Sequence, residues 1–123
     1  MPRPLTDREL AVLRAWLSFD VELAEELRTQ LEAAPLVDRS CECGCSSIGF
    51  VHSVETANVV GVGVFPIDAV VLDDAGEGIG GMVLLTKAGQ LHDVDVHTWT
   101  DNFEFPDLDH VRFAPKSSEG VQR

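Results

Sequence analysis

The most regular pattern in the chain is the stretch IGGMVLLTKAGQLHDVDVHTW (residues 79–99), which predicts a β-hairpin. Ile79–Thr86 is apolar on both faces, as a central strand is. Lys87-Ala88-Gly89-Gln90 predicts a four-residue turn, and Leu91–Trp99 alternates apolar and polar residues with the period of a strand. We therefore expect an antiparallel sheet built around this hairpin.

Shorter strand signals lie upstream of the hairpin. Val59–Phe65 and Ile67–Leu72 are rich in β-branched residues, and Leu36–Cys43 and Ser47–His52 are two further candidates. Together with the hairpin, they predict an antiparallel sheet of about four or five strands.

The N-terminal part of the chain predicts two helices instead. Thr6 and Glu9 have the spacing of a capping box, so the first helix is expected over Asp7–Leu17. Apolar residues then recur at helical spacing at Leu10, Leu13, Trp16 and Leu17. Asp20 is a candidate cap for the second helix, and Pro35 ends it. Its apolar stripe consists of Leu23, Leu27 and Leu31.

These patterns predict an α+β fold in which two N-terminal helices pack on one face of the antiparallel sheet. A chain of 123 residues fits a single domain, residues 1–123. We place its ordered core at about residues 5–113. Residues 114–123 are expected to form a loose tail, because they show no apolar periodicity.

The net charge of −12 is unevenly distributed. From Phe65 to His110 there are ten carboxylates and one basic residue, Lys87, which leaves −9 in that segment. Phosphate groups are bound by Lys and Arg, so nucleic acid and anionic membranes are disfavoured as partners. A basic protein partner or a cation is favoured, and the plainer alternative is a charged surface that keeps the protein in solution.

The start of the chain carries no apolar signal segment, and no run of about 18 apolar residues predicts a membrane span. Three cysteines cannot all pair within one chain. We therefore expect a cytoplasmic protein in a reducing compartment.

The second hairpin strand presents a row of polar side chains. Asp93, Asp95, His97 and Trp99 share one face with Leu91, and successive members lie about 6–7 Å apart. The opposite face carries His92, Val94, Val96 and Thr98. The two carboxylates and the imidazole suit part of a cation site or an acid–base pair. The alternative is the solvated face of a half-buried strand.

The cysteine cluster Cys41, Cys43 and Cys45 is a candidate zinc site. Thiolates are good zinc ligands, and three of them with one imidazole complete a tetrahedron. His97 is our candidate for the fourth ligand. Structural zinc sites more often use two C-x(2–4)-C pairs, so buried structural thiols at a turn are the alternative. No base adjacent in sequence supports a nucleophilic cysteine.

The segment after the hairpin combines aromatic and acidic residues. Aromatic side chains anchor interfaces, and carboxylates select a basic partner, so a recognition loop is one interpretation. In the other, the phenylalanines cover the open end of the core. The residues concerned are Trp99, Asp101, Phe103, Glu104 and Asp107.

Four stretches resemble a group of small actinobacterial proteins that share a Cys-x-Cys-Gly-Cys-[Pro/Ser]-Ser element. The matching stretches are Gln30-Leu31, the segment 41–47, the segment 89–95 and Phe105-Pro106-Asp107. This chain has Ser46 where proline is common and Asp95 where glutamate is common. The resemblance implies the α+β layout and no particular activity.

These observations favour a non-enzymatic protein-binding or regulatory module with an acidic face. Its partner is expected to be a basic protein or a second copy of the chain. The alternative is a zinc protein that uses the cysteine cluster. A small-molecule enzyme ranks third, because no complete catalytic constellation is present.

Overall fold

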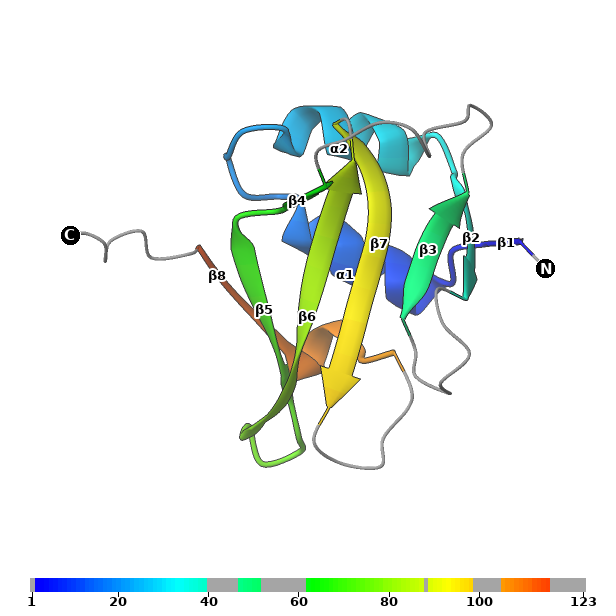
Figure 1. Ribbon diagram of the computed structural model, residues 1–123. Helices are drawn as coiled ribbons and strands as arrows, with labels where there is room; N and C mark the ends of the chain where they lie inside the picture. Colours follow the sequence, from blue (N-terminus) through cyan, green and yellow to red (C-terminus); the bar gives the residue numbers. More distant parts are fainter. Residues whose placement is uncertain (1, 40–46, 52–61, 88, 99–104, 116–123) are drawn as a thin grey trace.

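The computed structural model describes residues 2–39, 47–51, 62–87, 89–98 and 105–115. It has the expected α+β composition, with helices packed against an antiparallel sheet (Figure 1). In chain order the elements are β1 (Arg3–Pro4), α1 (Asp7–Trp16), α2 (Ala24–Glu32), β2 (Leu36–Arg39), β3 (Ile48–Val51), β4 (Val62–Val64), β5 (Ile67–Leu72), β6 (Gly78–Lys87), β7 (Gln90–Thr98), η1 (Leu108–His110) and β8 (Val111–Pro115).

Within the residues that the structure describes, the sheet has eight strands, so the predicted number of four or five was too small. The order is β1-β2-β3-β7-β6-β5-β8, and β4 pairs with β6 beside β5. Strand β8 pairs with β5 from Val71↔Val111 to Ile67↔Pro115. It therefore includes Ala114 and Pro115, beyond the core boundary that we placed at residue 113. Five residues with a proline at the end give too weak a local pattern to reveal a strand that the pairing with β5 stabilises.

Helix α1 begins as the sequence predicted. The Thr6 hydroxyl accepts from the Glu9 amide at 3.1 Å, and the Glu9 carboxylate accepts from the Thr6 amide at 2.9 Å. The two terminal N–H groups of Arg3 donate hydrogen bonds to the same carboxylate, each with an N···O distance of 2.8 Å. This buried Glu9 therefore ties strand β1 to the first turn of α1.

Helix α2 begins differently from the prediction. Its N-cap is Leu23, which has a left-handed φ of 73° and no side-chain capping bond, so Asp20 does not cap it. The Ala24 amide bonds the Val21 carbonyl instead, so backbone geometry alone turns the chain into the helix. Ala34 just beyond the helix also has a positive φ, 59°.

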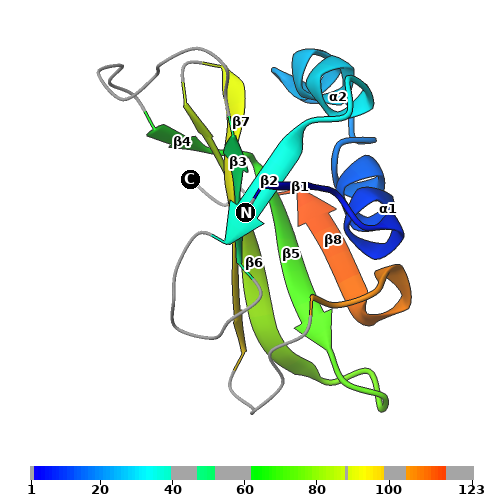
Figure 2. The same ribbon diagram turned by 90° about the vertical axis from the view of Figure 1, so that its right-hand side faces the viewer.

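Both helices lie on one side of the sheet, as Figure 2 shows. Trp16 is fully buried between the layers, and its indole N–H donates to the Ile67 carbonyl of β5 at 2.8 Å. The core consists of apolar side chains from both layers, including Leu13, Leu27, Ile67, Val71, Leu84, Val94 and Val96. No helix in the described part of the chain is long and apolar enough to cross a membrane.

The β6–β7 hairpin contains an irregularity that reverses the expected position of Leu91. The register changes between Leu85, which pairs with Asp93, and Thr86, which pairs with Leu91. His92 is the extra residue, and a bulge of this kind interrupts the alternation of side chains. Leu91 is therefore 1% exposed and lies in the core with Val94, not on the face of Asp93 as predicted.

Gln30 of α2 holds the start of β7 in place. Its side-chain amide donates to the Gly89 carbonyl at 2.9 Å and accepts from the Leu91 amide at 2.8 Å. The side chain thus makes the two bonds that a neighbouring strand would make.

Candidate functional site

The face of the sheet turned away from the helices carries the polar row of β7. Asp95 and His97 are exposed and Asp93 is half-buried, whereas Val94 and Val96 between them are buried in the core. The helical layer covers only the other face (Figure 2). The structure therefore brings three of the predicted site residues together on one open surface.

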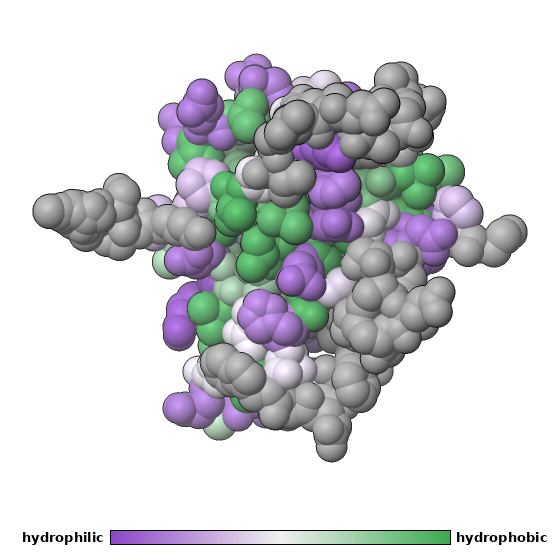
Figure 3. Space-filling view, viewed as in Figure 1, coloured by the Kyte–Doolittle hydropathy of each residue, from purple (hydrophilic) through white to green (hydrophobic). Residues whose placement is uncertain are grey.

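An apolar row lies directly beside this polar row. The cross-strand neighbours on β6 are Leu85 opposite Asp93, Val83 opposite Asp95 and Gly81 opposite His97. Val64 of β4 pairs with Leu85 and is 50% exposed. Figure 3 shows hydrophobic residues gathered at the centre of this face beside a column of hydrophilic ones. We call the set Asp93, Asp95, His97, Val83, Leu85 and Val64 the open sheet face.

The pKa of the Asp93 carboxyl group is raised in the folded protein. Burial raises its pKa, and the neighbouring charge of Asp95 raises it too. His92 opposes the shift, with its Nε2 3.6 Å from Asp93 Oδ2. A cation brought to this face would therefore stabilise a carboxylate that its own surroundings disfavour.

Ser47 fixes the start of β3 against the polar row. Its hydroxyl accepts a hydrogen bond from the Val96 amide at 2.8 Å. The same hydroxyl can donate its hydrogen to Asp95 Oδ1 at 3.1 Å or to the Val96 carbonyl at 3.2 Å. The imidazole ring of His97 lies over Gly81 of β6: a Cβ atom added to Gly81 would be 3.3 Å from His97 Nε2. Ser47 is buried, so this anchor is part of the fold.

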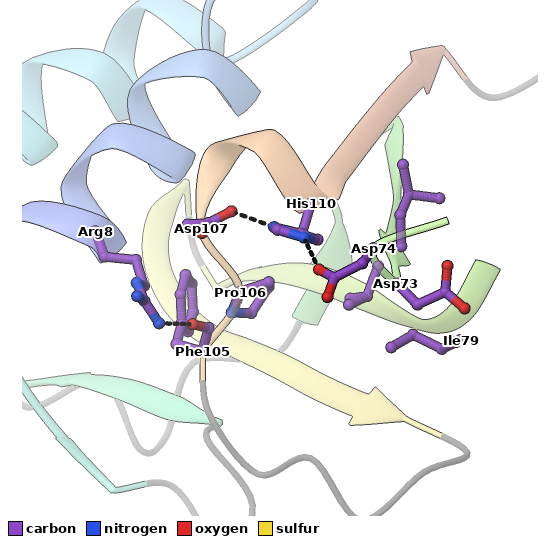
Figure 4. A pocket seen from close by; sticks show the side chains of 10 residues that line it. Arg8, Asp73, Asp74, Ile79, Phe105, Pro106, Asp107 and His110 are labelled. Carbon is purple, nitrogen blue, oxygen red and sulfur yellow. Dashed lines mark hydrogen bonds and ion pairs between the residues drawn. The ribbon is translucent and has the colours of Figure 1, made fainter. Parts of the chain in front are cut away.

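A second group of charged side chains surrounds a cavity of about 300 Å³ at one end of the sheet (Figure 4). We call this cavity the His110 hollow. Its lining residues are Arg8, Val71, Leu72, Asp73, Asp74, Ile79, Phe105, Pro106, Asp107 and His110. They come from the start of α1, the β5–β6 hairpin and the segment that contains η1.

The imidazole of His110 bridges two carboxylates at the edge of this hollow. Its Nδ1 lies 2.6 Å from Asp107 Oδ1 and its Nε2 2.8 Å from Asp74 Oδ1. Hydrogen bonds to Asp107 and then to Asp74 raise the pKa of His110, and the bond to His110 lowers the pKa of Asp107. The guanidinium of Arg8 donates to the Phe105 carbonyl at 3.0 Å on the other side of Asp107.

Asp107 therefore belongs to the His110 hollow, although we had grouped it with the aromatic and acidic residues of the segment after the hairpin. The spacing of Asp107 and His110 was the one local signal for this pair, because residues three apart meet in a helical turn. Asp74 carried no signal, since 36 residues separate it from His110.

The remaining predicted site residues lie outside the described ranges: Cys41, Cys43, Cys45, Trp99, Asp101, Phe103 and Glu104. Within those ranges, no three His, Cys, Asp or Glu side chains are grouped so that they could hold a metal ion. His97 is thus the one member of the predicted zinc site whose position is described. No family model, no curated protein and no solved structure matches the chain.

Proposed function

We propose that the protein is a non-enzymatic binding module whose open sheet face takes up a Lys- or Arg-bearing segment of a protein partner. The observation that carries the proposal is the row of Asp93 and Asp95 beside the apolar row of Val83, Leu85 and Val64. Aliphatic stems of Lys and Arg pack on apolar surface while their charged ends reach acidic groups. The two rows suit both parts of such a side chain.

The electrostatics of the face support the same partner. The two carboxylates lie about 6–7 Å apart on one strand, and the charge of Asp95 raises the pKa of Asp93. A basic residue between them relieves this repulsion. A second copy of this chain is the weaker partner, because two molecules of net charge −12 repel each other.

Comparative affinity capture tests the proposal. The immobilised protein, a D93N/D95N variant and a D20N/E22Q variant are exposed to the same lysate of the source cells. The last variant is the matched control, since Asp20 and Glu22 are exposed and precede α2, on the helical side of the molecule. Loss of two ion pairs is expected to weaken a genuine partner by roughly tenfold.

The expected result is a Lys/Arg-rich protein that the wild type and D20N/E22Q retain and D93N/D95N loses. Retention of the same proteins by all three would contradict the proposal. Circular dichroism of D93N/D95N establishes that the variant is folded, which both substituted side chains permit because neither lies in the core.

A zinc site is the second candidate, and the Ser47 anchor favours it. Ser47 bonds the backbone at Val96, immediately before His97. Cys45 precedes Ser47 by two residues, and two residues of extended chain reach at most about 7 Å. In this proposal Cys41, Cys43 and Cys45 supply thiolates and His97 the imidazole.

Elemental analysis of protein purified without added metal tests this second candidate. About one zinc per chain is expected for the wild type, with loss in Cys43→Ser and a reduced content in His97→Ala. His92→Ala is the matched control and is expected to keep its zinc. If the wild type contained substoichiometric amounts of zinc, iron and copper, the result would contradict the proposed zinc site.

A further inference from the structure

The contact of His110 with Asp74 joins two parts of the chain that no other described side-chain hydrogen bond or ion pair joins. Asp74 lies in the turn between β5 and β6, and its side chain is fully exposed apart from this contact. Asp107 lies at the start of η1, three residues before His110. The imidazole therefore spans the edge of the His110 hollow between the turn and the η1 segment, as the dashed lines in Figure 4 show.

The two contacts together depend on the protonation state of the imidazole ring. Only a protonated imidazole has two N–H donors, whereas a neutral ring has one donor and one acceptor. Carboxylates accept but do not donate when ionised. A neutral His110 can therefore donate to Asp107 or to Asp74, and its other nitrogen then places a lone pair against the remaining carboxylate.

Local geometry determines which contact is lost. Asp107 and His110 share one helical turn, and the His110 amide also bonds the Asp107 carbonyl at 3.0 Å. Asp74 has no such tether to the η1 segment and makes no other hydrogen bond or ion pair with the described residues. Its neighbour Asp73 accepts from the amides of Ala75 and Glu77, which keeps the turn itself folded.

We propose that His110 is a pH-sensitive latch: the imidazolium holds the β5–β6 turn against η1 beside the hollow, and the neutral ring releases it. Release separates the turn from η1 at the edge of the hollow, whose lining includes the apolar side chains of Val71, Leu72 and Ile79. This device is independent of the open sheet face, so the two proposals fail or succeed separately.

Several charged groups set the pH at which the latch opens. Asp74 of the turn and Asp107 beside η1 favour the imidazolium, which places release above the ordinary pKa of histidine. Asp73 of the turn and Arg8 of α1 are the other charged residues that line the hollow. Asp109 and Arg112 are the charged neighbours of His110 along the chain.

Nuclear magnetic resonance on the whole chain tests the latch. The His110 ring, the Asp74 and Glu77 amides and the Ile79 methyl groups are followed from about pH 5 to about pH 9. All four sets of signals are expected to move with one midpoint, above the value of about 6.5 for free histidine. An unmoved turn and unmoved Ile79 methyl groups while the His110 ring titrates would overturn the proposal.

Two variants sharpen the result. Asp74→Asn removes the carboxylate charge that faces His110 Nε2. The midpoint of the His110 titration is therefore expected to fall, and the pH-dependent movement of the turn is expected to vanish. Asp109→Asn makes the same charge change on η1 without touching the described contact, and the turn is expected to move with His110 as in the wild type. An Asp74→Asn midpoint equal to that of Asp109→Asn would show that the contact with Asp74 does not hold the turn.

Discussion

Gln90 and Gln30 both lie close to the start of β7, but their side-chain amides differ in hydrogen bonding. The Oε1 of Gln90 is buried and has no hydrogen-bond partner among the described residues. Gln30 close by makes two bonds to the start of β7 with the same functional group. The two glutamines therefore have opposite contributions to stability.

We predict that Gln90→Met raises or preserves the free energy of unfolding, because a buried acceptor without a donor costs about 1–3 kcal/mol. Gln30→Met is the matched control and is expected to lower it by more than about 1 kcal/mol, since it leaves the Leu91 amide without its partner. Urea unfolding measures both. Equal losses in the two variants would show that Gln90 does form a bond in solution.

His110 predicts a pH dependence of stability. Its pKa is raised in the folded protein, so its contribution to stability is fully present below the unfolded-state pKa of about 6.5. That contribution is lost as pH rises through the folded-state pKa. The urea midpoint of the wild type is expected to fall over this window relative to His110→Gln. Parallel curves for the two proteins would contradict the prediction.

At the scale of the elements, the end of α2 offers a stabilising change. Ala34 is exposed and has a φ of 59°, a conformation that costs an L-residue about 1–2 kcal/mol and glycine very little. The greater conformational entropy that glycine loses on folding offsets part of this gain. Ala34→Gly is therefore expected to raise the free energy of unfolding by about 0.5–1 kcal/mol.

The matched control is Ala33→Gly, one residue earlier. Ala33 is also exposed but has a φ of −80°, so glycine gains nothing there and its greater chain entropy lowers stability. Thermal unfolding of the two variants is expected to shift in opposite directions. A fall in both melting temperatures would show that α2 does not end in the left-handed conformation.

The starts of the two helices and strand β5 show what the sequence could and could not predict. The capping box of Thr6 and Glu9 is a local signal, and α1 begins where it predicts. Leu23 in a left-handed conformation has no such signal, because the surrounding fold imposes it. Strand β5 matches its predicted range, since three of its six residues, Ile67, Val70 and Val71, are β-branched.

Long-range contacts explain the remaining differences. Strands β1 and β8 are too short to show periodicity and are formed by pairing with distant segments. The bulge that buries Leu91 depends on the registry of two strands, which alternation alone does not determine. At the site, the alternation of β7 predicted the row of Asp93, Asp95 and His97, whereas the contact of Asp74 with His110 required the fold.

At the scale of the whole molecule, the two-layer architecture and the charge distribution act together. Among the described elements, the helices cover one face of the sheet (Figure 2), and the acidic and apolar rows lie on the other face. A net charge of −12 attracts a basic partner and repels a second copy. Complex formation is therefore expected to weaken as salt concentration rises, because added ions screen exposed charges.

Site-specific photo-crosslinking in the source cells tests the open sheet face most directly. A photoreactive amino acid replaces Val64, which is 50% exposed beside Leu85, and in a second protein it replaces Glu22 near α2. We predict a covalent adduct with one Lys/Arg-rich protein from position 64, absent from position 22 and reduced by D93N/D95N. Equal adducts from both positions, or an adduct that D93N/D95N leaves unchanged, would contradict the proposal that this face binds a basic partner.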